Sequence, residues 1–233
     1  MNVYQFEMLV SLLKPCLLKR SCRKPLTLEQ KLCMVLKYLA QGGSSQSLAR
    51  EFCVGRSTMN KVIIEVCSAL WNVSSTKYMS QPTEREWEGI VTDFWENPNG
   101  FYDANYTFKC VDVRDYGLKN DGSVFAASAF GQLLLTENVT CLPHRMLSGS
   151  NIYSPYTFVG DAALPLKSCI MKPCPGNNLC AAETIFNYRL SRSMKTVENA
   201  VGILGVRWQI YNQAIAGSAR NCNEYCYGYN VFT

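Results

Sequence analysis

Two stretches decide the fold of this chain: residues 156–166, YTFVGDAALPL, and residues 185–208, IFNYRLSRSMKTVENAVGILGVRW. The apolar run at 156–159 is short, rich in β-forming residues and bounded by a proline and a glycine, which predicts a buried strand. Asp161 follows this run directly, where α/β sheets hold ligands beyond the carboxyl ends of their strands. Asp161 is therefore a candidate functional carboxylate.

The second stretch predicts a long helix that carries another carboxylate. Its apolar residues recur three or four positions apart, which defines one buried helix face. These residues are Leu190, Met194, Val197, Val201, Leu204 and Trp208. Glu198 lies just beside this stripe, so we expect it at the buried edge of the helix and directed toward Asp161. Two different elements would then present two carboxylates.

The charge of the chain is unevenly distributed. Residues 1–80 carry eleven Lys and Arg against four Asp and Glu, a net charge of +7, whereas residues 81–233 carry a net charge of −2. With 233 residues and 48% hydrophobic content, the chain can bury a core and form one or two domains. This asymmetry predicts a polyanion-binding module followed by a module that uses carboxylates, over residues 1–80 and 81–213. Residues 214–233, which lack a sustained period, are interpreted as a poorly ordered tail.

Composition argues against two other classes of protein. The twelve cysteines form no Cys-x-x-Cys pair and the chain has one histidine, so a structural zinc site is not expected and the thiols are interpreted as reduced. The apolar runs fall short of the ~20 residues that a membrane span needs. We expect no membrane partner.

The basic part of the chain predicts a helix-turn-helix. Thr27 and Gln30 have the spacing of a capping box, and Gly42 supplies a left-handed stop for the helix that Thr27 begins. A short helix is predicted over residues 46–52 and, after a turn at residues 53–56, a third helix that Ser57 caps. Cys53 stands where many such motifs carry glycine.

In such a motif the first residues of the last helix face the major groove of DNA. Here these residues are Arg56, Ser57, Thr58, Asn60 and Lys61. Arg can contact guanine, Asn can contact adenine, and Lys or a hydroxyl can hold phosphate. The alternative is an ordinary three-helix bundle with a polar outer face.

The rest of the second module predicts mixed local structure. A helix begins at Thr83, a hairpin with a first arm of only two residues occupies residues 101–113, and a small helix spans residues 123–130. Asp121 is interpreted as a turn residue, with a third acid as the alternative. Residues 136–155 and 172–178 are predicted to be loops.

Several stretches together resemble one family, the PIF/Harbinger transposases and the nucleases derived from them. The resemblance covers roughly residues 4 to 213 and is carried by FVGDAALPLKSCIMKPCPG, VENAVGILGVRW, YGLKNDGSVFAASAFG, DANYTFKCVDV and the helical segment of residues 26–71. It implies an α/β fold in which an RNase H-like domain with a mixed sheet follows the helical domain. It also implies DNA as partner, a nuclear location, with cytoplasm as a second compartment, and a separately encoded Myb-like partner protein.

The resemblance further implies three acids that bind two Mg²⁺ or Mn²⁺ ions and cleave the DNA backbone. Asp161 matches the second acid and Glu198 the third. Carboxylates suit this role because Mg²⁺ prefers hard oxygen ligands, and two ions can clamp the attacking and leaving oxygens of a phosphoryl transfer.

The chain departs from the family where the first acid should lie. That acid belongs to a strand expected after Asn99, yet the chain passes almost directly into DANYTF. The first-acid strand and most of its neighbour are missing, so we expect an incomplete sheet and an inactive nuclease. Asp103, which follows a glycine at the family spacing, is the alternative third metal ligand.

Three functions stay open from sequence: a metal-dependent DNA endonuclease, whole or residual; a non-catalytic helix-turn-helix DNA-binding protein; and a non-functional transposon fragment.

Overall fold

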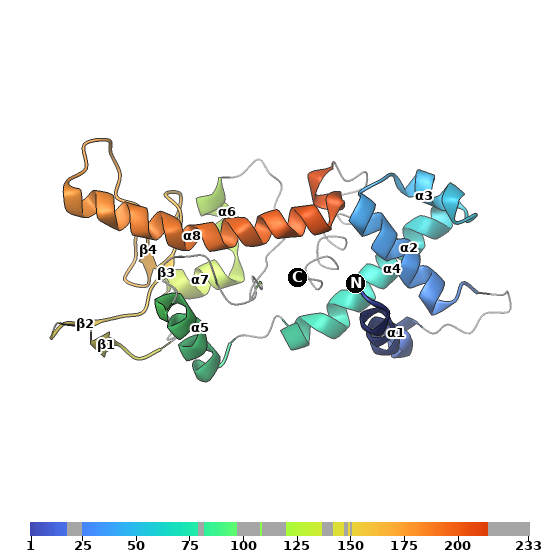
Figure 1. Cartoon of the computed structure of the whole chain (residues 1–233), viewed down its shortest axis with the longest axis horizontal. Helices are drawn as coiled ribbons and strands as arrows, with labels where there is room; N and C mark the ends of the chain where they lie inside the picture. Colours follow the sequence, from blue (N-terminus) through green and yellow to red (C-terminus); the bar gives the residue numbers. More distant parts are fainter. Residues whose placement is uncertain are drawn as a thin grey trace. The chain divides into compact units, whose positions relative to one another are not determined.

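The structure is a computed structural model that describes residues 1–17, 25–78, 82–96, 108, 120–136, 142–146, 149 and 151–213 (Figure 1). It divides into two compact units. Unit 1 comprises Met1–Ser80 and Val201–Thr233, and unit 2 comprises Gln81–Ala200. The predicted hairpin over residues 101–113, apart from Phe108, and the predicted tail after residue 213 lie outside the described residues.

The regular elements that the structure describes in unit 1 are all helices. Its elements are α1 (Val3–Leu17), α2 (Leu28–Gln41), α3 (Ser45–Glu51), α4 (Arg56–Tyr78), the last turns of α8 (Ala181–Arg207) and the 3-10 helix η1 (Gln209–Asn212). The predicted ends of α2 are confirmed. The Gln30 backbone N–H donates to Thr27 Oγ1 at 3.2 Å, the Thr27 N–H donates to the Gln30 side chain at 3.0 Å, and Gly42 adopts φ +65°.

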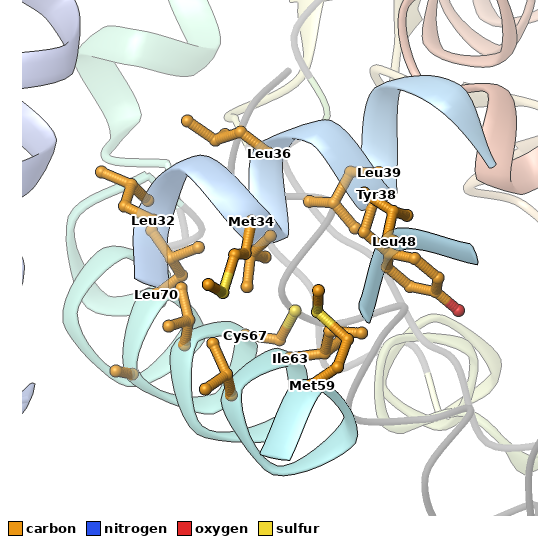
Figure 2. Packing of buried hydrophobic residues seen from close by; sticks show 14 of the residues in the cluster. Leu32, Met34, Leu36, Tyr38, Leu39, Leu48, Met59, Ile63, Cys67 and Leu70 are labelled. Carbon is orange, nitrogen blue, oxygen red and sulfur yellow. The ribbon is translucent and has the colours of Figure 1, made fainter. Parts of the chain in front are cut away.

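The core of unit 1 forms around one face of α4. Met59, Ile63, Val66 and Leu70 are each fully buried there and pack among side chains of α1, α2 and α3. Figure 2 shows part of this core, with labelled side chains from α2, α3 and α4. These partners include Leu13, Leu17, Leu32, Val35, Leu39 and Leu48. Burying one such side chain stabilises the fold by about 1.5–3 kcal/mol, so this face of α4 holds the helices of unit 1 together.

The turn between α3 and α4 differs from the prediction by one residue. Helix α4 begins at Arg56, so Ser57 lies inside its first turn and is not its cap. Cys53 has φ +53°, the left-handed conformation that glycine adopts most easily, which explains why this position of the motif commonly holds glycine.

The first elements that the structure describes in unit 2 are the helices α5 (Glu84–Glu96), α6 (Asp121–Ala127) and α7 (Ala129–Leu135). The start of α5 is as predicted, because the Thr83 N–H donates to Glu86 Oε2 at 2.8 Å and the Glu86 N–H donates to Thr83 Oγ1 at 3.4 Å. The single helix predicted over residues 123–130 is wrong. Ser128 has ψ 150°, which ends α6, and its hydroxyl accepts the Gly131 N–H at 2.8 Å, which starts α7.

The described strands are short and form two separate sheets. Strand β1 (Arg145–Met146) pairs antiparallel with β2 (Tyr153–Ser154), and β3 (Phe158–Val159) pairs parallel with β4 (Ile170–Met171). The prediction of a loop over residues 136–155 is therefore wrong at β1 and β2. Both strand orientations of the predicted mixed sheet occur, but the described residues combine helices with small two-stranded sheets.

Helix α8 starts earlier than predicted and buries a different face. The Cys180 N–H donates to Glu183 Oε2 at 2.8 Å at its start, and this bond holds the pKa of Glu183 below its ordinary value. The predicted apolar stripe is wrong at Val197 and Val201, which are 61% and 53% exposed. The buried positions of α8 are Leu190, Thr196, Ala200 and Leu204, because small side chains as well as large ones occupy its inner face.

Among the helices that the structure describes, none combines the length and the apolar character needed to cross a membrane.

Replacing Cys53 by glycine should raise the free energy of unfolding by about 1 kcal/mol, because glycine removes the strain of a side chain at positive φ. Chemical denaturation of the full chain measures this change. The control is Cys33→Gly at an exposed position within α2, which should lower stability by about 1 kcal/mol. A Cys53→Gly variant less stable than the parent would contradict the strain argument.

Candidate functional site

The first candidate site is the exposed side of the start of α4. Arg56, Ser57, Thr58 and Lys61 are exposed and Asn60 is half-buried, whereas Met59 on the opposite side is fully buried. The buried side fixes the rotation of the helix, so these polar side chains share one outward surface. The structure thus brings together all five residues predicted to contact DNA.

Helix α3 packs closely beneath α4. Ala49 is buried with 3% exposure, and its carbonyl accepts the Val54 N–H at 2.9 Å, which closes the tight turn between the two helices. Ser44 caps α3, since its Oγ accepts the Ser47 N–H at 3.1 Å. This is the bihelical arrangement that the sequence predicted.

An ion pair also holds α4 in place. Lys31 Nζ of α2 lies 3.3 Å from Glu65 Oε2 of α4, and both side chains are largely buried, at 10% and 22% exposure. The sequence analysis did not predict this pair. The apolar pattern identifies only hydrophobic residues as buried, whereas Lys31 lies on the buried side of α2. Removing either side chain would leave the other charge buried without a partner. The pair therefore restrains the position of α4 relative to α2.

The second candidate site is the turn after β3, which carries Asp161. The Phe158 N–H donates to the Cys169 carbonyl at 2.8 Å and the Gly160 N–H donates to the Met171 carbonyl at 2.9 Å, which holds this strand beside β4. Asp161 is exposed, and its Oδ1 accepts the Ala163 N–H at 3.1 Å. The predicted placement of an acid just past a strand is confirmed. The prediction that this strand is buried is wrong, because Phe158 is half-buried and Val159 is exposed, and the strand is shorter than expected.

Two aromatic rings anchor the strand that precedes Asp161. Phe158 makes edge-on contacts with Trp87 of α5 and Phe130 of α7, with ring centroids 5.7 and 5.5 Å apart. Such pairs contribute about 0.5–1.5 kcal/mol beyond area burial. These contacts position the strand from two helices that lie far from it in sequence.

The first turn of α6 lies against the Asp161 turn. A Cβ added to Gly122 would stand 2.5 Å from the Ala163 carbonyl oxygen, so only glycine permits this approach. The neighbouring Asp121 is exposed in the first turn of α6, and its interpretation as a turn residue is therefore wrong. Its alternative role as a third acid stays a prediction.

Glu198 lies on an exposed face of α8, so the expectation that it lines the buried edge is wrong. Asp161 and Glu198 belong to the same unit. Across the ranges that the structure describes, no group of three or more His, Cys, Asp or Glu side chains could hold a metal ion. Asp103 lies outside these ranges. Within those ranges no complete metal site is assembled, and we derive no metal-dependent step from the described carboxylates.

The described residues thus present an exposed polar helix start in a basic helical unit and a strand-end carboxylate in a second unit. Comparison with protein families gave two matches. Residues 20–65, which include α2, α3 and the start of α4, match the CENP-B N-terminal DNA-binding domain. Residues 100–231 match the DDE superfamily endonuclease family.

Because the endonuclease match covers more than half of the 233 residues, the chain belongs to the DDE superfamily endonucleases. No curated protein and no solved structure matched the chain. The endonuclease match runs to residue 231 and so extends past residue 213, where the resemblance found from the sequence ends.

Gly122→Ala should lower the stability of the chain, because the added methyl group would collide with the Ala163 carbonyl and displace the Asp161 turn. We expect a loss of about 1–3 kcal/mol in chemical denaturation, as for other overpacked positions. The matched control is Gly89→Ala in α5, where no atom lies within 4 Å of the added Cβ. There the same change should stabilise the helix by up to about 1 kcal/mol. Equal effects of the two substitutions would contradict the close approach.

Proposed function

We propose that this chain is a transposase-derived protein of the PIF/Harbinger type that binds duplex DNA through the start of α4 and does not cleave it. The observation that carries the proposal is the arrangement of α4 itself. Five polar residues, from Arg56 to Lys61, share an outward surface while the opposite side of the helix is locked in the core. The match to a DNA-binding domain over these residues supports the same assignment.

The chemistry of this surface suits a duplex. The Arg56 guanidinium can contact a guanine edge and the Asn60 amide an adenine edge, while Lys61 and the hydroxyl groups hold phosphates. The net charge of +7 in residues 1–80 adds attraction for the phosphate backbone that does not depend on base sequence. DNA binding also suits a nuclear location.

Affinity for a DNA duplex should fall steeply between low and moderate salt, because each neutralised phosphate releases counterions. Arg56→Ala and Lys61→Ala should each weaken binding, by about tenfold for one lost charged contact. Fluorescence anisotropy of the full chain with a labelled duplex measures both effects.

Lys195→Ala, which removes one exposed charge from α8 in unit 2, is the matched control and should leave affinity within about twofold. Affinity that does not respond to salt would exclude phosphate contact as its source. Equal losses from Lys61→Ala and Lys195→Ala would show that only net charge matters and not the surface of α4.

The endonuclease part is proposed to retain Asp161 and Glu198 as carboxylates from the family's metal-binding set. The support is their place in the family motifs, GDAALPL and VENAVGIL, and the position of Asp161 at the end of β3. Mg²⁺ or Mn²⁺ would be the metal, since hard cations take carboxylate oxygens. Asp103 remains the alternative further ligand, and a Myb-like protein remains the proposed partner.

The proposed lack of nuclease activity follows from the absence of the strand that carries the family's first acid. Positioning supplies most of the catalysis in phosphoryl transfer, and the strand expected to position the first acid is missing after Asn99. Two carboxylates alone would have to compensate the charge of two divalent ions, so the second ion should bind poorly.

Purified protein incubated with supercoiled plasmid in Mg²⁺ or Mn²⁺ should therefore leave the plasmid intact, as should an Asp161→Ala variant. Gel electrophoresis measures nicking and linearisation. Cleavage by the parent chain that Asp161→Ala abolishes would overturn the proposed inactivity and establish a working nuclease.

A further inference from the structure

We propose that residues 208–212, which belong to the endonuclease-family part of the sequence, complete the DNA-binding unit and set the joint between α2 and α3. The 20–65 match to a DNA-binding domain does not include this segment, which begins more than 140 residues downstream of that match. The predicted effect on DNA affinity rests on the proposed function. The structural role of residues 208–212 does not.

The segment contributes directly to the core of unit 1. Ile210 of η1 is 2% exposed and belongs to the same buried cluster as the core leucines of α2, and Trp208 and Tyr211 pack against that cluster. A core side chain from outside the matched domain indicates that residues 20–65 do not close their own core. Leaving Ile210 out would expose apolar surface on α2.

The contact is made at the end of α2, where the chain turns toward α3. Gly42 has φ +65°, and a Cβ built on it would stand 2.7 Å from both the carbonyl carbon and oxygen of Gln209. Backbone therefore lies against backbone with no room for a side chain. Gly43 and then Ser44, which caps α3, follow Gly42 directly in the sequence. The contact with η1 therefore fixes the position of the start of α3.

The segment is also held to the helix that leads into it. The Asn212 side-chain amide donates to the Gly205 carbonyl at 3.1 Å, and the Trp208 N–H donates to the Leu204 carbonyl at 2.9 Å. These bonds satisfy carbonyls at the end of α8 and keep η1 folded back. The segment is thus an ordered part of unit 1, with one side on α8 and the other on α2.

The consequence for DNA binding follows from the geometry of the motif. Helix α3 packs beneath α4 through Ala49, and contacts by α3 position the exposed surface of α4. Loss of the η1 contact should free the α2–α3 joint while the core around α4 persists. DNA affinity would then fall although the DNA-contacting residues are unchanged.

The test compares two substitutions of the full chain that add the same charge. Ile210→Asp places a carboxylate in the buried contact, whereas Val206→Asp replaces a side chain that is 75% exposed. We expect Ile210→Asp to weaken duplex binding by at least about tenfold and Val206→Asp to change it by less than about threefold. Equal affinities of these two variants would overturn the proposal.

Hydrogen exchange separates a local effect from unfolding and needs no DNA. In Ile210→Asp, protection should fall at the amides of Gly42, Ser47 and Leu48 and remain at those of α4. Uniform loss across unit 1, or no loss, would contradict the assignment to the joint. If the parent chain fails to bind DNA, the proposed function fails, and the exchange result still decides whether the segment sets the joint.

A second pair of variants tests the backbone contact. Asparagine tolerates positive φ, so Gly42→Asn mainly introduces a side chain against Gln209, while Gly43→Asn meets no atom within 4 Å of its Cβ. Gly42→Asn should reproduce the pattern of Ile210→Asp and Gly43→Asn should not. The opposite ranking would refute the contact at Gly42.

Discussion

The structure of unit 1 depends on the burial of one face of α4. Met59, Ile63 and Val66 are inaccessible to solvent, and α1, α2 and α3 each pack on this helix. A helix that is buried on one face cannot rotate without exposing that face, so the burial also determines which residues point outward. The surface from Arg56 to Lys61 is therefore a consequence of the core. The Lys31–Glu65 ion pair adds a directional restraint that apolar packing alone does not supply.

In unit 2 the described strands are too short to form a stable sheet by themselves, so other contacts must stabilise them. A two-residue strand with one neighbour buries little surface, and isolated two-stranded sheets are marginal in water. Phe158 compensates by contacting aromatic rings of α5 and α7. The turn with Asp161 is thus held by side-chain packing and by the close approach of Gly122, more than by strand pairing.

Sequence predicted those features that depend on a few neighbouring residues. The capping box at Thr27 and Gln30, the left-handed Gly42 and the acid after β3 each follow from local chemistry and are found. Features that depend on distant partners were missed. The inner face of α8 uses Thr196 and Ala200, which periodicity of large apolar residues does not identify. Likewise, no local pattern indicates that Ile210 enters the core of a domain that begins near the other end of the chain.

If the proposed function holds, DNA binding tolerates the loss of residues better than DNA cleavage does. Phosphate contacts are long-range and lose affinity gradually, since each lost charge removes only its own share of counterion release. Cleavage requires several groups held within fractions of an ångström, so the loss of one positioning strand removes most of the rate. The basic charge lies in residues 1–80, whereas the strand that the family resemblance leads us to expect would follow Asn99. A chain that loses that strand can therefore keep its DNA-binding surface intact, provided that residues 208–212 still complete the core on which α3 and α4 depend.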